Sequence, residues 1–233
     1  MALAGEGAVA IWHDIAPEGR EQFYAWHGEE HMPERVGIPG FLRGRRYVAI
    51  RANLEFFNLY EAQSPQVLTG TDYQTRLNAP SPWTLSSVKY FSGVARSICR
   101  VAATFGRGHG GIAATWRYDV PDDAADQHMA AMTEMVLPAL ARKPGVAGVH
   151  LLLADVSASA VKTEEQKARP GEANRIPRWI IIVEGWGDEA PFATLCETAL
   201  SDAVLAKQGA SGSADFGLYR LQTTRTKTDW TAG

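Results

Sequence analysis

The stretch Trp26-His27-Gly28-Glu29-Glu30-His31-Met32-Pro33 lies within residues 14–40. The predicted fold depends on these residues, because a similar sequence occurs 105 positions later, at 119–145. A shift of 105 pairs seven identical residues within 27 ungapped positions. The pairs are Asp14 with Asp119, Gln22 with Gln127, Ala25 with Ala130, Glu29 with Glu134, Pro33 with Pro138, Pro39 with Pro144 and Gly40 with Gly145. In a chain of average composition, roughly one or two identical pairs would arise by chance over this length. We therefore predict two copies of one unit, residues 1–105 and 106–233.

Each copy has the order strand–helix–strand–strand–helix–strand, which is typical of a ferredoxin-like βαββαβ unit. In the first copy the strands are expected at 8–15, 41–50, 55–61 and 88–104, with helices at 17–36 and 64–77. In the second copy the strands are expected at 112–120, 146–156, 179–186 and 216–225, with helices at 122–142 and 188–207. The glycine-rich stretch 106–111 between them is read as a linker. The predicted fold class is α+β.

The segment Ser157–Pro177 interrupts the second copy. It is polar and charged and has no apolar periodicity. Such a segment buries too little apolar surface to offset the entropy lost on ordering. We expect a flexible loop over 157–177, or a lid, within a second copy that is mainly structural.

The composition sets limits on the class of protein. At 233 residues the chain suits one large or two small domains, and no apolar run approaches the roughly 20 residues of a membrane span. The N-terminus shows no secretory signal pattern, and Cys99 and Cys196 lack metal-type spacing. A net charge of −3 gives no reason to expect a nucleic-acid or membrane partner. These features favour a cytoplasmic protein with free thiols.

Three ionisable residues of the opening stretch share one side of a helix: His27, Glu30 and His31. A shift of 105 pairs them with Met132, Met135 and Val136, apolar residues of the kind a core-facing helix normally carries. Burying ionisable groups is unfavourable unless they are paired. We therefore predict that the first copy holds the functional site, with His31 as general acid or base and Glu30 or His27 orienting it or relaying the proton.

The same stretch matches the H-x-x-E-H pattern of inverted zinc peptidases. Five residues with three fixed make a weak motif, no third ligand is evident, and a ferredoxin-like unit is the wrong scaffold for such a peptidase. We predict no metal site.

Further candidates could hold a substrate. Asn58 and Tyr60 share one face of their strand, where the second copy has the aliphatic Ile181 and Val183. His13 ends the first strand and fits either a core histidine or a site residue. Two more candidates for substrate binding are Arg45 and Trp83. Arg45, in a basic strand with Arg43, Arg46 and Arg51, either pairs with Glu55 or Glu61 or holds an anionic substrate group. Trp83, in a proline-containing loop, either covers a pocket mouth or is exposed.

The βαββαβ order, the helix pattern Trp-x-x-x-Glu-His-x-Pro and the Pro39-Gly40 turn resemble EthD-like dimeric α/β-barrel proteins. In that superfamily two ferredoxin-like units pair so that their sheets close into a barrel. The resemblance covers both halves and implies that this one chain forms a complete barrel. It also implies that His31 corresponds to the characteristic histidine of the family. The superfamily includes cofactor-free monooxygenases, lactone isomerases, dehydratases, lyases and haem enzymes, so fold alone fixes no reaction.

The leading hypothesis is a small-molecule enzyme without a tightly bound cofactor. His-based proton transfer beside a carbonyl, as in an isomerase, lyase or dehydratase, would act on a small, partly apolar carbonyl or aromatic compound. One alternative is a ligand-binding or assembly protein without turnover. Others are a cofactor-free oxygenase and a haem enzyme with His31 or His27 as axial ligand. A homodimer is compatible with the resemblance.

Overall fold

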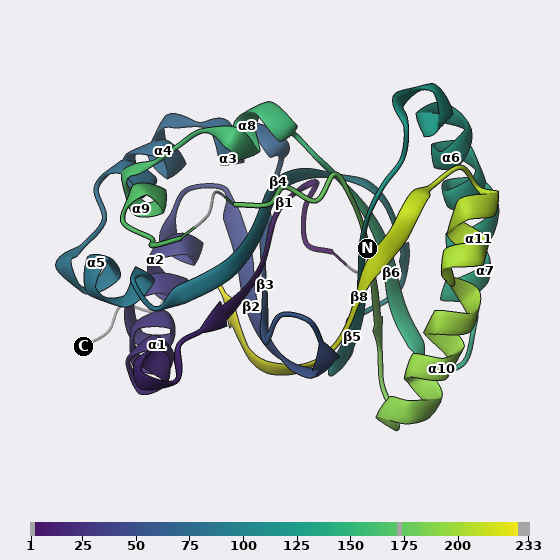
Figure 1. Cartoon of the computed structure of the whole chain (residues 1–233), viewed down its shortest axis with the longest axis horizontal. Helices are drawn as coiled ribbons and strands as arrows, with labels where there is room; N and C mark the ends of the chain where they lie inside the picture. The colour runs from purple at the N-terminus through teal and green to yellow at the C-terminus, as the bar shows by residue number, and fades with distance from the viewer. Residues whose placement is uncertain (1–2, 172–173, 228–233) are drawn as a thin grey trace.

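The computed structural model describes residues 3–171 and 174–227, so residues 1–2 of the predicted first copy and 172–173 of the predicted loop lie outside it. In the described part, eight antiparallel strands close into a barrel with helices on its outside (Figure 1). The order around the barrel is β1-β3-β2-β8-β5-β7-β6-β4. The strands are β1 (Gly7–Ile15), β2 (Phe41–Ala52), β3 (Phe56–Ala62), β4 (Phe91–Gly106), β5 (Ile112–Asp119), β6 (Val146–Ala154), β7 (Trp179–Gly185) and β8 (Ser211–Thr226).

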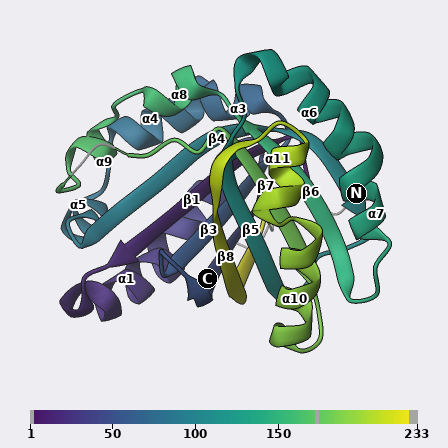
Figure 2. The ribbon, with the colours of Figure 1, turned by 45° about the vertical axis from the view of Figure 1, so that its right-hand side comes forward.

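The helices form two groups on opposite sides of the barrel (Figures 1 and 2). The first unit carries α1 (Arg20–Trp26), α2 (Met32–Gly37), α3 (Pro65–Thr69), α4 (Thr71–Asn78) and α5 (Pro82–Val88). The second carries α6 (Ala125–Ala131), α7 (Leu137–Ala141), α10 (Glu189–Ala199) and α11 (Asp202–Lys207). None of the helices in the described residues is long and apolar enough to cross a membrane.

The predicted fold class is confirmed: two ferredoxin-like units share one barrel. Each unit contributes four adjacent strands, in the order β4-β1-β3-β2 and β6-β7-β5-β8. The units join where β2 pairs with β8 and where β4 pairs with β6. Closure removes the sheet edges that each unit would otherwise expose, so neither sheet leaves a strand unpaired.

Both units contain a π-helical turn at the same place in the first helix. It spans His27–His31 in the first unit, where the Met32 amide donates to the His27 carbonyl, and Met132–Val136 in the second. Pro33 and Pro138 follow these turns at equivalent positions. Proline removes one helical donor and crowds the preceding turn, and a π-turn accommodates both effects. The two turns share only Glu29 and Glu134, so we attribute their common geometry to the prolines.

Three segments differ from the sequence predictions. The expected helix over 64–77 breaks at Gly70 into α3 and α4, because Gly70 has an extended backbone. Residues 82–88 form α5, although Trp83 was expected in a loop and Val88 at the start of a strand. Its N-cap Ser81 accepts a hydrogen bond from the Thr84 amide. β8 begins at Ser211, five residues before the expected start at 216.

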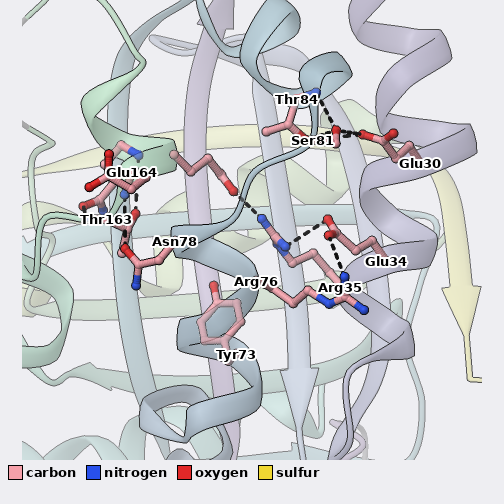
Figure 3. A network of polar contacts seen from close by, with 12 residues as sticks. Glu30, Glu34, Arg35, Tyr73, Arg76, Asn78, Ser81, Thr84, Thr163 and Glu164 are labelled. Atoms are coloured by element: carbon pink, nitrogen blue, oxygen red, sulfur yellow. Dashed lines mark hydrogen bonds and ion pairs between the residues drawn. The ribbon is translucent and has the colours of Figure 1, made fainter.

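The segment expected as an irregular loop contains two short helices, α8 (Val156–Ala160) and α9 (Glu164–Lys167). Although it belongs to the second unit, it lies beside α3, α4 and α5 of the first (Figures 1 and 2). The Glu164 amide donates to Asn78 Oδ1 of α4 at 3.3 Å, as Figure 3 shows. The Ile98 amide of β4 donates to the buried Ser159 hydroxyl at 2.9 Å. The second unit therefore provides part of the cover over the first.

The interior of the barrel combines aromatic packing with buried charge. Strand alternation turns Trp12, Tyr47, Phe57 and Tyr219 inward, and the Trp12 and Phe57 rings stack with centroids 4.8 Å apart. Further along, Arg45 of β2 is fully buried and lies 2.6 Å from Glu184 of β7 and 3.0 Å from Glu61 of β3.

Arg43 also binds Glu61, and His150 Nε2 lies 3.3 Å from Glu184. Because Arg45 and Glu184 come from different units, this ion pair crosses the shared barrel. The charges stabilise one another only as a set, since a buried ion left without its partner is strongly destabilising.

Replacing Glu184 with Gln should therefore lower the free energy of unfolding by about 3–5 kcal/mol. Burial alone would raise the pKa of Glu184, but Arg45 and His150 lower it to about 2, below its ordinary value of 4.5. The stabilisation is present above pH 4.5 and is lost as pH falls toward 2. Urea unfolding at neutral and acid pH measures both effects. The exposed Glu164→Gln is the control, and equal losses in the two variants would contradict the network's role.

Candidate functional site

The candidate site lies between the outer face of the first-unit sheet and the helix that carries the π-turn. The residues it brings together are His13 of β1, Asn58 and Tyr60 of β3, and His27 and His31 of the turn. All five have exposed fractions of 6% or less. Phe23, Trp26, Phe56 and Phe91 pack around them as an aromatic cluster. Five polar side chains thus share a largely apolar environment.

His13 occupies a β-bulge, where the register between β1 and β4 shifts between Trp12 and Asp14. A bulge re-aims the side chain it carries, and here the imidazole lies against Phe56 and Phe91. Asn58 Nδ2 lies 2.9 Å from His13 Nε2, and His13 Nδ1 lies 3.4 Å from the Asp14 carbonyl oxygen. The carbonyl can only accept, so His13 donates from Nδ1 and accepts at Nε2. Burial lowers the pKa of His13 to about 3 and keeps it neutral.

The hydrogen bonds of His27 fix its tautomer. Arg46 Nη1 lies 3.2 Å from Nδ1, and the Tyr60 hydroxyl lies 3.0 Å from Nε2. A guanidinium only donates, so Nδ1 must accept, and the single proton of the neutral ring lies on Nε2. His27 therefore donates to the Tyr60 oxygen. The hydroxyl proton of Tyr60 remains available for another acceptor.

The second unit contains a comparable pair with the opposite polarity. The Tyr118 hydroxyl lies 2.9 Å from His128 Nε2, while His128 Nδ1 lies 2.9 Å from the Gln208 carbonyl oxygen. The carbonyl requires the proton on Nδ1, so Nε2 accepts and Tyr118 donates. The hydroxyl proton of Tyr118 is thus committed within the protein, whereas that of Tyr60 is not. This difference separates a structural pair from one that can serve a ligand.

In the first unit, His31 lies next to the His27–Tyr60 pair. Its ring centroid is 5.6 Å from that of His27 and 4.3 Å from that of Trp26. Its Nδ1 is buried and has no hydrogen-bond partner among the described residues. Burial lowers the pKa of His31 well below its ordinary value, with further lowering from Arg35 and Arg169. The ring is therefore neutral at pH 7, and its Nδ1 is buried and unsatisfied within the described part of the chain, as is Oδ1 of Asn58.

Cationic side chains surround the histidines. Arg35, one helical turn after His31, binds Glu165 of the α9 segment, and Arg169 donates to the same carboxylate at 2.8 Å. Burial lowers the pKa of His27 well below its ordinary value, and the neighbouring His31 and Arg46 lower it further. Arg35 also donates to Glu34 at 3.0 Å, so Arg35 and Arg169 have two carboxylate partners between them. Arg46 adds a further positive charge beside His27, which favours an anionic ligand.

Three of the predicted site residues do not join the histidines. Glu30 accepts a hydrogen bond from the Ser81 hydroxyl at 2.5 Å and links the π-turn to α5 (Figure 3). A π-turn has more residues per turn than an α-helix, so His31 stays over His27 while Glu30 turns away. Arg45 lies on the barrel side of β2 and pairs with Glu61 and Glu184. Trp83 lies on α5, half-buried against the aromatic cluster.

Sequence reasoning missed four charged residues of the site. Arg46 alternates with Arg45 along β2 and therefore faces the helix, and Arg35 follows His31 by four residues on the same helix. The strand alternation and the helical spacing could therefore have placed Arg46 and Arg35 near the site. Glu165 and Arg169 belong to a segment without periodicity, and nothing in the sequence places that segment over the other unit.

The residues present do not fit a metal or a haem group as arranged. Among the described residues, no three His, Cys, Asp or Glu side chains converge as metal ligands would. Both nitrogens of His27 are engaged, and His31 is packed against Trp26 with its Nδ1 buried. None of these three nitrogens is open to a haem iron in this arrangement.

Solved structures with the same architecture are found, although no protein-family model and no curated protein sequence matches the chain. An anthrone oxidase-like protein has a TM-score of 0.61 at 13% identity, covering 94% of this chain and 92% of its own. A proposed monooxygenase from Fusobacterium nucleatum subsp. nucleatum has a TM-score of 0.60 at 9% identity, covering 97% and 96%. One from Lactobacillus acidophilus has a TM-score of 0.56 at 10% identity, covering 95% and 96%.

The chain has the dimeric α/β-barrel fold. The likeness extends over nearly the whole of each chain, so it includes both units and the closed barrel. At these identities the likeness establishes fold alone. The predicted superfamily architecture is thereby confirmed, while the reaction has to be argued from the residues.

The two tautomers give a direct test of the site. Imidazole ¹⁵N NMR should find His27 protonated on Nε2 and His128 on Nδ1, with His13, His27 and His31 still neutral well below their ordinary pKa of 6.5. The unfolded chain takes up protons below its histidine pKa of about 6.5, whereas the folded protein does not. Folding stability should therefore fall as pH drops below that value. A His27 that titrates near pH 6.5 would contradict the assigned geometry.

Proposed function

We propose that the protein is a small-molecule enzyme that removes a proton from an acidic C–H or O–H group of an aromatic or carbonyl compound. The observation that carries this proposal is the unpartnered Nδ1 of a buried, neutral His31 beside a Tyr60 whose hydroxyl proton is uncommitted. One group can accept a proton and the other can donate a hydrogen bond. Aromatic side chains around them suit a flat, partly apolar molecule.

His31 is the proposed general base. Its low pKa in the free protein makes it a weak base, but the causes are burial and the nearby Arg35 and Arg169. An anion forming between the imidazole and these arginines offsets their charge and raises the proton affinity of the ring. The site thus favours proton removal only when negative charge develops on the substrate, which is the condition for catalysis.

Tyr60 is the proposed donor to the developing oxyanion. Burial raises the pKa of Tyr60, so the hydroxyl remains protonated. The chain Arg46–His27–Tyr60 orients the phenol oxygen, because the His27 Nε2–H donates to it at 3.0 Å. A hydroxyl that accepts one hydrogen bond becomes a better donor in another, so His27 and Arg46 act as positioning residues.

The anion can follow two courses. Reprotonation at another atom gives isomerisation, whereas electron transfer to O₂ gives oxidation, with the balance R₂CH₂ + O₂ → R₂C=O + H₂O. In the second course the substrate carbon is oxidised, one oxygen atom enters the product, and the other leaves in water. The structures similar to this chain include an anthrone oxidase-like protein and two proposed monooxygenases, which favours the oxidative course.

The test is oxygen uptake with anthrone-type phenolic ketones, in which a CH₂ group lies between two aromatic rings. We expect one O₂ to be consumed for each carbonyl formed. His31→Val, which introduces the residue of the second copy, should lower turnover by about 10²-fold or more with little change in melting temperature. Tyr60→Phe should also lower turnover, because the oxyanion loses a donor.

Tyr118→Phe is the matched control, since it removes the structural tyrosine of the second unit. It should leave turnover per folded molecule unchanged. Enolate or phenolate absorbance without oxygen uptake would replace oxidation by isomerase or lyase chemistry. Binding with no spectral change in any variant would overturn the enzyme proposal in favour of a ligand-binding protein.

A further inference from the structure

A cavity of about 820 Å³ lies where the α8–α9 segment of the second unit meets β4 of the first. Its described lining contains four cationic residues, Lys162, Lys167, Arg169 and Arg175, and no Asp or Glu. Lys167 pairs with Glu164 on the surface, and Arg175 lies 3.9 Å from Asp215. The lining is therefore strongly basic in a protein whose net charge is −3. Such a cavity concentrates small anions.

Arg169 is the buried member of this set. Its side chain is 9% exposed, and its guanidinium lies over the Phe91 ring, 5.3 Å from the centroid. Nη2 donates to Glu165, while Nε and Nη1 are buried without a hydrogen-bond acceptor among the described residues. Glu165 is shared with Arg35, which also binds Glu34 at 3.0 Å. Buried guanidinium donors without acceptors are unfavourable, and a planar oxyanion would satisfy two of them at once.

Arg169 also separates the cavity from the histidines. It lines the cavity and contacts Phe91, which in turn lies against His13 with ring centroids 4.4 Å apart. The same guanidinium is close enough to His31 to act on its charge. A molecule whose anionic end meets Arg169 would thus have its other end near the aromatic cluster around the proposed base.

We infer that this cavity binds aromatic carboxylates, with Arg169 as the carboxylate ligand and the lysines of the α8–α9 segment at its rim. The inference names the substrate class of the proposed function and rests on it for the identity of the reaction, although carboxylate binding can be measured without turnover. It also makes the segment 156–171 of the second unit a determinant of specificity for the site of the first unit.

The experiment compares 2-naphthoate with its neutral isostere 2-naphthamide by calorimetry. The wild-type protein should bind the carboxylate about tenfold or more tightly than the amide, the scale of a hydrogen bond to a charged group. Arg169→Gln should abolish this preference, and Arg169→Lys should retain part of it, because it keeps the charge but loses the planar fork. Arg51→Gln, at an exposed ion pair outside the cavity, should leave the preference unchanged.

A further variant separates the possible failures. Glu165→Gln/Arg169→Gln removes both partners of the Arg169 ion pair, so a loss of preference in this variant cannot be ascribed to a stranded carboxylate. Carboxylate preference without turnover on any substrate would sustain this inference and defeat the proposed function. Equal binding of the two probes by the wild type, or a preference that survives Arg169→Gln, would overturn the inference.

Discussion

The ion pair between Arg45 and Glu184 inside the barrel joins the two units, and the rest of the structure depends on that junction. The two residues belong to different units and are fully buried, so this pair forms only when the units close around it. Closure also satisfies the strand edges along β2–β8 and β4–β6. The first unit's sheet is thereby fixed from its inner side, and its outer face can carry polar groups that contribute little to stability. The site is built on that outer face.

The two units share a backbone and differ in how they use it. Both have the π-turn, the proline after it and a tyrosine–histidine pair beneath the helix layer. In the second unit a backbone carbonyl completes the pair, and aliphatic residues fill the remaining space. In the first unit the pair occupies other positions, since a shift of 105 places Met132 opposite His27, and Val136 opposite His31. There Arg46 donates to His27 Nδ1, so the guanidinium sets the direction of the hydrogen bond to Tyr60.

Much of the fold could be read from the sequence because its signals are local or periodic. Strand alternation, the proline and glycine positions and the 105-residue shift predict the element order and the two units. They also group His27 with His31 and Asn58 with Tyr60, whereas His13 was left open between a core and a site residue. Glu30 was misplaced because helical spacing assumes 3.6 residues per turn, and the π-turn departs from it. Arg45 pairs with Glu61, one of the alternatives that the sequence left open for it. The contribution of Glu165 and Arg169 depends on a tertiary contact for which the sequence has no local signal.

The joining of both units in one chain has a consequence for how such a barrel can change. In a barrel made of two identical chains, each substitution appears twice, so a histidine placed under one helix is also placed under the other. Here the halves are encoded separately, and the α8–α9 segment of one half can adapt to a site that only the other half contains. One half can therefore keep a structural role while substitutions change the site in the other half. The backbone of the two halves stays similar, and their functions can differ.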